Sequence, residues 1–155
     1  MNKIDVKIQK LYPDVETPFY ATEKSAGMDV RAYFGTSKDG AVSYQSVMPR
    51  ETKLIPTGLK IAIPDGYEMQ VRPRSGLSLK TKLRVANSPG TVDADYRGEV
   101  CVIIENTSDS NIVINHGDRI AQLVFAPVFQ ANLEVVDSLD ETARGEGGFE
   151  STGRK

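Results

Sequence analysis

The chain has one cysteine and one histidine, and no run of apolar residues approaches the ~20 that a membrane-spanning helix needs. The single cysteine, Cys101, cannot form an internal disulfide, so the fold needs no oxidising compartment and we expect the protein in the cytoplasm. Because Cys101 lies between two valines, we predict a small buried side chain. The shortage of both residue types argues against structural zinc and against Ser–His or Cys–His nucleophilic catalysis.

An excess of positive charge is also missing. The chain has 19 Lys and Arg residues against 21 Asp and Glu residues, which argues against nucleic acid or an anionic membrane as the main partner. Residues 1–10 alternate charged and apolar side chains, so we expect no signal peptide there. No Gly-x-x-x-x-Gly-Lys loop is present, which excludes a P-loop protein. The 155 residues are most simply one domain that buries roughly 68–70% of its unfolded surface.

Short stretches of alternating apolar residues, separated by turn residues, make up most of the chain. Such alternation places apolar side chains on one face of a strand. Two stretches flank Pro64-Asp65-Gly66 and predict a β-hairpin. Residues 100–104 are apolar at every position and predict a strand buried on both faces. In total, we predict strands over 3–10, 59–63, 67–71, 100–104, 112–114, 120–125 and 133–136.

The pattern typical of helices is weak. The best candidate begins at Ser75 as its N-cap and runs to about Leu83, and eight prolines and thirteen glycines interrupt the rest. This predicts a mostly β fold, an antiparallel jelly roll or β-barrel-like single domain with one short helix. We expect residues 1–137 to form the core domain and residues 138–155 to form a mobile C-terminal arm.

The C-terminal segment 144–153 contains four glycines around Phe149. Glycine lets backbone N–H groups approach an anion closely, while Arg144 supplies a forked cation and Ser151 and Thr152 supply hydroxyls. With the flat face of Phe149, these groups suit a ligand that has a ring at one end and phosphates at the other. A disordered glycine-rich tail is the alternative, and the segment alone favours neither.

Two internal stretches could also bind an anion or a metal, although each has a simpler explanation. Arg74, Ser75 and Gly76 stand at the predicted helix start, where exposed N–H groups and the helix dipole favour phosphate. A capped helix with a surface arginine explains them equally well. Asp29, in the stretch AGMDV, lies within a strand-like run. An aspartate in such a run is more often a turn or edge residue than a metal partner.

Two further stretches are more polar than their surroundings require. Residues 90–98, GTVDADYRG, place two carboxylates, an aromatic ring and an arginine in one tight turn, and neither Tyr96 nor the preceding Asn87 is needed for turning. Gln122 lies on an otherwise apolar strand face, so its amide must find hydrogen-bond partners. His116 lies in an Asn-His-Gly-Asp turn, and we predict that it is exposed and has no role. Carboxylates, arginines and hydroxyls in glycine-rich turns suit a phosphate ester that binds with Mg²⁺ and is attacked by water.

Taken in order, five stretches closely resemble the trimeric dUTPases, which hydrolyse dUTP to dUMP and pyrophosphate. The stretches are AGMDV, RPRSGL, GTVDADYRGEV, GDRIAQLV and RGEGGFESTG, and together they extend from Ala26 to Gly153. Each motif alone is weak, but five in series make coincidence very improbable. The resemblance implies Mg²⁺ as cofactor and a homotrimer whose three active sites are shared between subunits. It also implies a cellular role in keeping uracil out of DNA and in supplying dUMP for dTMP synthesis.

The resemblance assigns the deoxyuridine pocket to residues 87–101. Backbone groups of Thr91, Val92 and Cys101 and the amide of Asn87 would read the uracil edge, in a hairpin that begins at Gly90. Tyr96 would pack under the deoxyribose and exclude a 2′-hydroxyl. Asp93 would hold the 3′-hydroxyl and act as the general base that deprotonates the attacking water.

The resemblance assigns the phosphates to the other motifs. Arg74, Ser75 and Gly76 would grip the middle of the triphosphate, and Gln122 would bind phosphate oxygens or metal-bound water. Mg²⁺ would be held mostly by phosphates and waters, with Asp29 contacting it through a water molecule. In the arm, Phe149 would stack on uracil, and the residues that would engage the γ-phosphate are Arg144, Ser151 and Thr152. One departure is Glu150, where the family usually has a small residue.

Two other functions are compatible with this fold. The dCTP deaminase branch shares it but would need further acid–base residues, and the Asp93–Tyr96 hairpin fits a uracil pocket better. A non-enzymatic jelly-roll module would tolerate the loss of Asp93 or of the arm, and this chain retains both.

Overall fold

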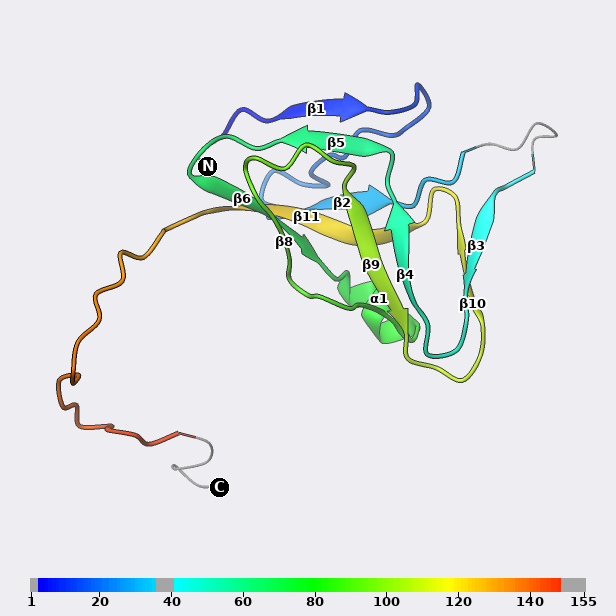
Figure 1. Cartoon of the computed structure of the whole chain (residues 1–155). Helices are drawn as coiled ribbons and strands as arrows, with labels where there is room; N and C mark the ends of the chain where they lie inside the picture. Colours follow the sequence, from blue (N-terminus) through cyan, green and yellow to red (C-terminus); the bar gives the residue numbers. More distant parts are fainter. Residues whose placement is uncertain (1–2, 36–40, 149–155) are drawn as a thin grey trace.

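The computed structural model describes residues 3–35 and 41–148. Within these residues the chain forms antiparallel strands and one short helix (Figure 1). The elements, in chain order, are β1 (Lys7–Lys10), β2 (Met28–Arg31), β3 (Tyr44–Val47), β4 (Thr52–Pro56), β5 (Leu59–Ala62), β6 (Tyr67–Arg72), α1 (Ser75–Lys80), β7 (Leu83–Val85), β8 (Gly90–Val92), β9 (Cys101–Asn106), β10 (Ile112–Asn115) and β11 (Arg119–Pro127).

In the described part of the chain the strands form four sheets, and every pairing between them is antiparallel. One sheet has the order β2-β11-β6-β8 and another has the order β4-β9-β7, while β1 pairs with β5 and β10 pairs with β3. The core lies between them, because the buried side chains come from all four sheets. Ile55, Leu59, Met69, Ile104 and Leu123 are among the fully buried ones. The predicted mostly β, antiparallel fold with one short helix is confirmed. In the described part of the chain, no helix is long and apolar enough to cross a membrane.

The predicted hairpin around Pro64-Asp65-Gly66 is wrong. Residues 59–62 and 67–72 are both strands, but β5 pairs with β1, whereas β6 pairs with β8 and β11. Gly66 has a φ of 82°, which allows the tight connection. Alternation predicts that a segment is a strand, but it does not identify the partner, and here the two strands belong to different sheets.

Three other local predictions need correction. The N-terminal strand covers only Lys7–Lys10, all exposed. Strand β9 is buried on one face, with alternate residues only partly buried. The helix ends at Lys80, because Thr81 has extended backbone; the Thr81 N–H and hydroxyl both donate to the Leu77 carbonyl and so satisfy the last turn. Its N-cap is Arg74, which has extended backbone and no side-chain cap bond, so Ser75 is the first helical residue and not the cap.

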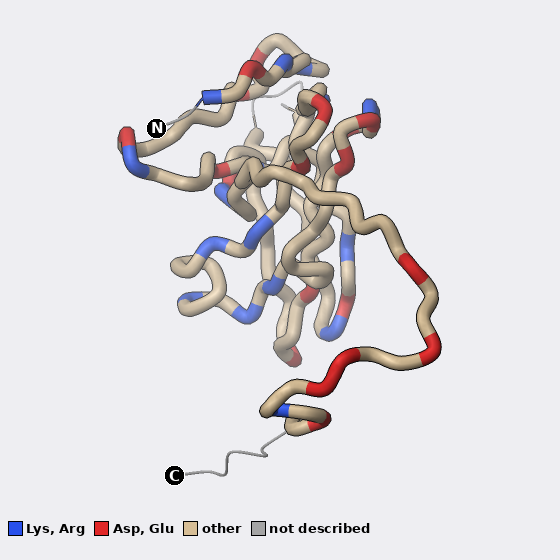
Figure 2. The backbone as a smooth tube through the Cα atoms, turned by 90° about the vertical axis from the view of Figure 1, so that its left-hand side faces the viewer, with Lys and Arg blue, Asp and Glu red and all other residues tan. Residues whose placement is uncertain are grey.

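Residues 128–148 contain no helix or strand, so the predicted strand over 133–136 is wrong for this single chain. The segment leaves the end of β11 and runs away from the domain, with several acidic residues along it (Figures 1 and 2). Leu133 is 87% exposed and Val135 is 99% exposed. The alternation of apolar residues is present, but among residues 3–35 and 41–148 of one chain no strand lies beside it to complete a sheet.

His116 is half-buried and bonded, which corrects the prediction that it is exposed. Its Nδ1 accepts a hydrogen bond from the Phe34 N–H at 3.1 Å, and its ring meets the Tyr33 ring edge to face. Tyr33 also stacks on Tyr12 and donates from its hydroxyl to Asp14 Oδ1 at 2.8 Å. This cluster attaches the N-terminal segment to the turn before β11.

Asn106, at the end of β9, has a fully buried polar side chain that holds neighbouring segments together. Its Nδ2 donates to the carbonyls of Val47 and Ser110, at 2.9 and 2.8 Å, and its Oδ1 accepts from the N–H and hydroxyl of Ser108. The amide therefore joins β9 to the end of β3 and to the turn before β10.

We expect Asn106→Leu to lower the free energy of unfolding by about 2–4 kcal/mol, because it removes the donor to the buried Val47 carbonyl and the acceptor for the Ser108 N–H and hydroxyl. The matched control is Ser108→Ala, which removes one partner at the more exposed end of the network and is expected to cost about 1 kcal/mol. Urea unfolding followed by circular dichroism measures both. Equal losses for the two variants would contradict this account.

Tyr33 gives a pH dependence. Burial, followed by the hydrogen bond to Asp14 and its charge, raises the pKa of Tyr33 to about 12. A phenol whose pKa is higher in the folded state stabilises the fold below its unfolded pKa of about 10, and this stabilisation is lost as the pH rises towards the folded value. We therefore expect the unfolding free energy to fall more steeply between about pH 10 and pH 12 in the wild type than in Tyr33→Phe. Tyrosinate absorbance in the ultraviolet should show the corresponding late-titrating phenol only in the wild type.

Candidate functional site

The predicted nucleoside-binding residues line one hollow of about 220 Å³, which we call the β8–β9 hollow. Its lining is Leu54, Val71, Asn87, Gly90, Thr91, Val92, Tyr96, Glu99, Val100, Cys101 and Ile103. The structure thus brings Asn87, Gly90, Thr91, Val92, Tyr96 and Cys101 to one place.

The hollow exists because two sheets separate there. Strand β8 belongs to the sheet of β6, whereas β9 belongs to the sheet of β7. The pairing of β7 with β9 ends at Val85 and Ile104, and one further hydrogen bond joins the Ala86 N–H to the Ile103 carbonyl. The start of β9 at Cys101 therefore faces the hollow and not β7. Gly90 allows Asn87 to lie close, since a Cβ at Gly90 would be 3.0 Å from Asn87 Nδ2. Backbone groups and a side-chain amide can thus converge on a flat ligand.

Cys101 is only partly buried, which corrects the prediction of a buried side chain. Burial, and then the nearby charge of Glu99, raise the pKa of its thiol. A thiol with a raised pKa stays protonated at neutral pH and is a poor nucleophile.

Asp93 follows β8 directly and is exposed beside the β8–β9 hollow. The turn that carries it is closed by the Tyr96 N–H, which donates to the Asp93 carbonyl at 3.2 Å. Arg97 Nη1 donates to the carbonyls of Ala94 and Tyr96, at 2.6 and 2.8 Å. An accessible carboxylate on a fixed turn can accept a proton from a water molecule.

The predicted phosphate-binding residues gather around Asp29. Its two carboxylate oxygens accept from Arg74 Nε at 2.8 Å and from Arg119 Nη1 at 3.1 Å. Gln122 lies opposite Asp29 on the neighbouring strand and donates to the Pro73 carbonyl at 2.9 Å. The predicted need of Gln122 for a partner is confirmed. Ser75 and Gly76 are exposed at the start of α1, with open space around Gly76.

Arg119 is a candidate that the sequence prediction missed. It lies within the motif GDRIAQLV, three residues before Gln122, and its side chain is half-exposed. The signal was available, because a basic residue beside a predicted phosphate-binding glutamine is itself suited to phosphate. Only the structure shows that Arg119 and Arg74 share one carboxylate.

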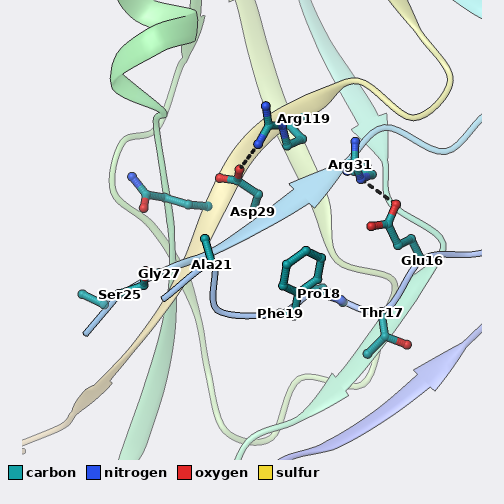
Figure 3. Close-up of a pocket in the computed structure, with 12 residues that line it drawn as sticks. Glu16, Thr17, Pro18, Phe19, Ala21, Ser25, Gly27, Asp29, Arg31 and Arg119 are labelled. Carbon is teal, nitrogen blue, oxygen red and sulfur yellow. Dashed lines mark hydrogen bonds and ion pairs between the residues drawn. The ribbon is translucent and has the colours of Figure 1, made fainter. Parts of the chain in front are cut away.

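A second hollow of about 350 Å³ lies beside Asp29, and we call it the β2–β11 hollow. Figure 3 shows Asp29 and Arg119 on one side of it and Phe19 and Pro18 on the other. Its lining is Glu16, Thr17, Pro18, Phe19, Ala21, Ser25, Ala26, Gly27, Asp29, Arg31, Arg119 and Gln122. The two hollows share no lining residue.

The pairing register explains this separation. Val92, next to Asp93, is opposite Met69 on one edge of β6, whereas Gln122 is opposite Arg72 on the other edge. Asp93 is one residue beyond Val92, so it lies four residues along the strand direction and two strand spacings across the sheet from Gln122, which puts their Cα atoms about 16 Å apart. One chain therefore does not bring the predicted base to the predicted phosphate-binding residues.

The arm residues are only partly described. Arg144 is exposed and donates from Nε to the Gly147 carbonyl at 2.7 Å, within the segment that runs away from the domain. Phe149, Ser151 and Thr152, and the unusual Glu150, lie outside the described residues.

The described residues contain no group of three or more His, Cys, Asp or Glu side chains that could hold a metal ion. Both oxygens of Asp29 are bonded to arginines, yet each keeps a lone pair that can accept from a metal-bound water. These residues therefore fit Mg²⁺ that is held mainly by a substrate's phosphates and by waters.

Comparison with known proteins identifies the family. A family model for dUTPase matches residues 14–153. Curated relatives named deoxyuridine 5'-triphosphate nucleotidohydrolase include one from Maricaulis maris, 52% identical over the whole of both chains, and one from Roseobacter denitrificans, 53% identical over 90% of this chain and 88% of its own. Among solved structures, a mutant dUTPase of Staphylococcus bacteriophage 80alpha with dUpNHpp is 25% identical and superposes with a TM-score of 0.84, covering 98% of this chain and all of its own. By sequence and by fold, this chain belongs to the dUTPase family.

Proposed function

We propose that the protein hydrolyses dUTP to dUMP and pyrophosphate, with Mg²⁺, by in-line attack of water on the α-phosphorus. The observation that carries the proposal is the β8–β9 hollow, where six residues predicted to bind deoxyuridine converge. The names of the curated relatives and the dUTP analogue bound to the phage enzyme support the same substrate. In the cytoplasm, this activity would keep uracil out of DNA and supply dUMP for dTMP synthesis.

The β8–β9 hollow would select uracil. Backbone groups at Thr91, Val92 and Cys101 cannot change their pattern of donors and acceptors, so the wrong base would leave buried groups without partners. The Asn87 amide would complete the edge. The Tyr96 ring, which lines the same hollow, would pack under the deoxyribose and leave no room for a 2′-hydroxyl.

The chemical step would depend on Asp93 and on the cationic residues around Asp29. Asp93 would hold the 3′-hydroxyl and deprotonate the attacking water. Arg74, Ser75, Gly76 and Gln122 would hold the phosphates in line, and Asp29 would fix the Arg74 guanidinium. Mg²⁺, when bound, would neutralise charge on the phosphate oxygens, and Asp29 would contact it through a water molecule.

The distance of about 16 Å between the Cα atoms of Asp93 and Gln122 argues that a second copy completes the site. An attacking water activated by Asp93 must lie next to the phosphorus, so the phosphate-binding residues of the same chain are too far away. We infer a homotrimer with three shared sites, in which the arm of residues 138–155 closes over a site of neighbouring subunits. Phe149 would then stack on uracil, and Arg144, Ser151 and Thr152 would engage the γ-phosphate.

A complementation experiment tests the shared site. Asp93→Asn and Arg74→Gln chains are expected to be nearly inactive alone, and random trimers assembled from an equal mixture should recover up to about one quarter of wild-type turnover. The fraction follows because a site then needs Asp93 from one neighbour and Arg74 from the other, each with a chance of one half. The double variant in a single chain, mixed with itself, is the control. No recovery in the mixture would show that both residues act within one chain.

Asp93→Asn tests the base. We expect turnover to fall by about 10²–10⁴-fold, while dUMP binding, measured by calorimetry, stays within a few-fold of the wild type. A loss of dUMP binding as large as the loss of turnover would show that Asp93 acts by holding the 3′-hydroxyl and not as the base. Ammonia released from dCTP would favour the deaminase branch, and pyrophosphate release from dUTP at the uncatalysed rate would favour a non-enzymatic module.

A further inference from the structure

Tyr96 lines the β8–β9 hollow but is not held by the core, since 45% of the residue is exposed. An exposed ring normally moves between rotamers on a fast timescale. If the Tyr96 ring is to exclude a 2′-hydroxyl, it must keep its position to within a fraction of an ångström. Something other than core packing must therefore hold this ring.

Gly98 provides the space for the ring. The Tyr96 side chain folds back over the backbone two residues further on, so that a Cβ at Gly98 would lie 2.5 Å from Tyr96 Cζ and 3.0 Å from Cε2, and closer still to the hydroxyl oxygen. Real Cβ atoms do not approach other atoms so closely, so the ring can take this position only above a glycine. The Gly98 backbone does not have a positive φ, so its role is to give space and not conformational freedom.

Two hydrogen bonds complete the support. The Tyr96 hydroxyl donates to the Glu99 carbonyl at 3.0 Å, and Arg97 ties down the Tyr96 carbonyl. The acceptor is itself fixed, because the Glu99 carboxylate accepts from the Gly58 N–H at 2.7 Å and the Val100 N–H donates to the Leu59 carbonyl at 2.8 Å. The ring therefore rests on backbone that is anchored to the start of β5.

We propose that Gly98 is a specificity-determining residue, which acts by seating the Tyr96 ring so that the ring excludes a 2′-hydroxyl. The inference rests on the proposed hydrolysis of dUTP. It adds that discrimination between deoxyribose and ribose depends on a residue that has no side chain and touches no substrate. Glu99 supports the same position through its carbonyl.

Gly98→Ala is the direct test. The added methyl group meets the free end of a side chain and not the backbone, so we expect the ring to swing aside while the fold remains. The ratio of kcat/KM for dUTP to that for UTP should fall by about tenfold or more. Asp95→Ala, at an exposed neighbour in the same turn, is the matched control and should keep the wild-type ratio. Thermal melting checks that both variants are folded.

A double-mutant cycle separates this role from a purely structural one. If Gly98 acts only through Tyr96, the double variant Gly98→Ala/Tyr96→Ala should have the same dUTP-to-UTP ratio of kcat/KM as the single variant Tyr96→Ala. Tyr96→Phe, which keeps the ring but loses the bond to the Glu99 carbonyl, should lower the ratio by only about two- to fivefold.

The outcomes are distinguishable. A wild-type protein that hydrolyses neither nucleotide overturns the proposed function and, with it, this inference. If the wild type prefers dUTP and the Gly98→Ala variant prefers it equally, the inference about Gly98 is wrong and the proposed function stands. A Gly98→Ala effect that persists in the Tyr96→Ala background also overturns it, because Gly98 would then act on something other than the ring.

Discussion

The pairing of β6 with both of its neighbours is the constraint on which the rest of the site depends. Through β8 it fixes one wall of the β8–β9 hollow, and through β11 it fixes Gln122 beside Asp29. Because register in a sheet moves in whole residues, neither group of residues can drift towards the other. The same pairing that builds each half of the site therefore keeps the two halves apart within one chain.

Charge is arranged to match this division. Around Asp29 one carboxylate serves two guanidinium groups, so the region keeps a surplus of positive charge where a polyanion would bind. The β8–β9 hollow has a different character, because Glu99 is the one charged residue in its lining and the others are apolar or uncharged polar residues. A nucleotide has the same polarity along its length, and each half of the molecule is suited to one end of it.

The sequence predicted which motif residues lie together better than it predicted the strand pairing. The resemblance assigned Thr91 and Tyr96 to one pocket, and both line the β8–β9 hollow because they are only five residues apart on one turn. The pairing of β5 with β1 was not predictable, because alternation identifies a strand and not its partner. Arg119 was missed because its significance is its shared carboxylate, which is a long-range contact. Residues 133–136 show the same limit, since a strand pattern without a neighbouring edge stays unpaired.

The distance between Asp93 and Gln122 also has a consequence for control of the activity. A catalyst that is complete within one chain works at any dilution, whereas one divided between copies works only while the copies remain associated. Catalysis would then rise more steeply than in proportion to the amount of protein. A folded but solitary chain, or the first chains made by a cell, would be silent until enough partners had accumulated.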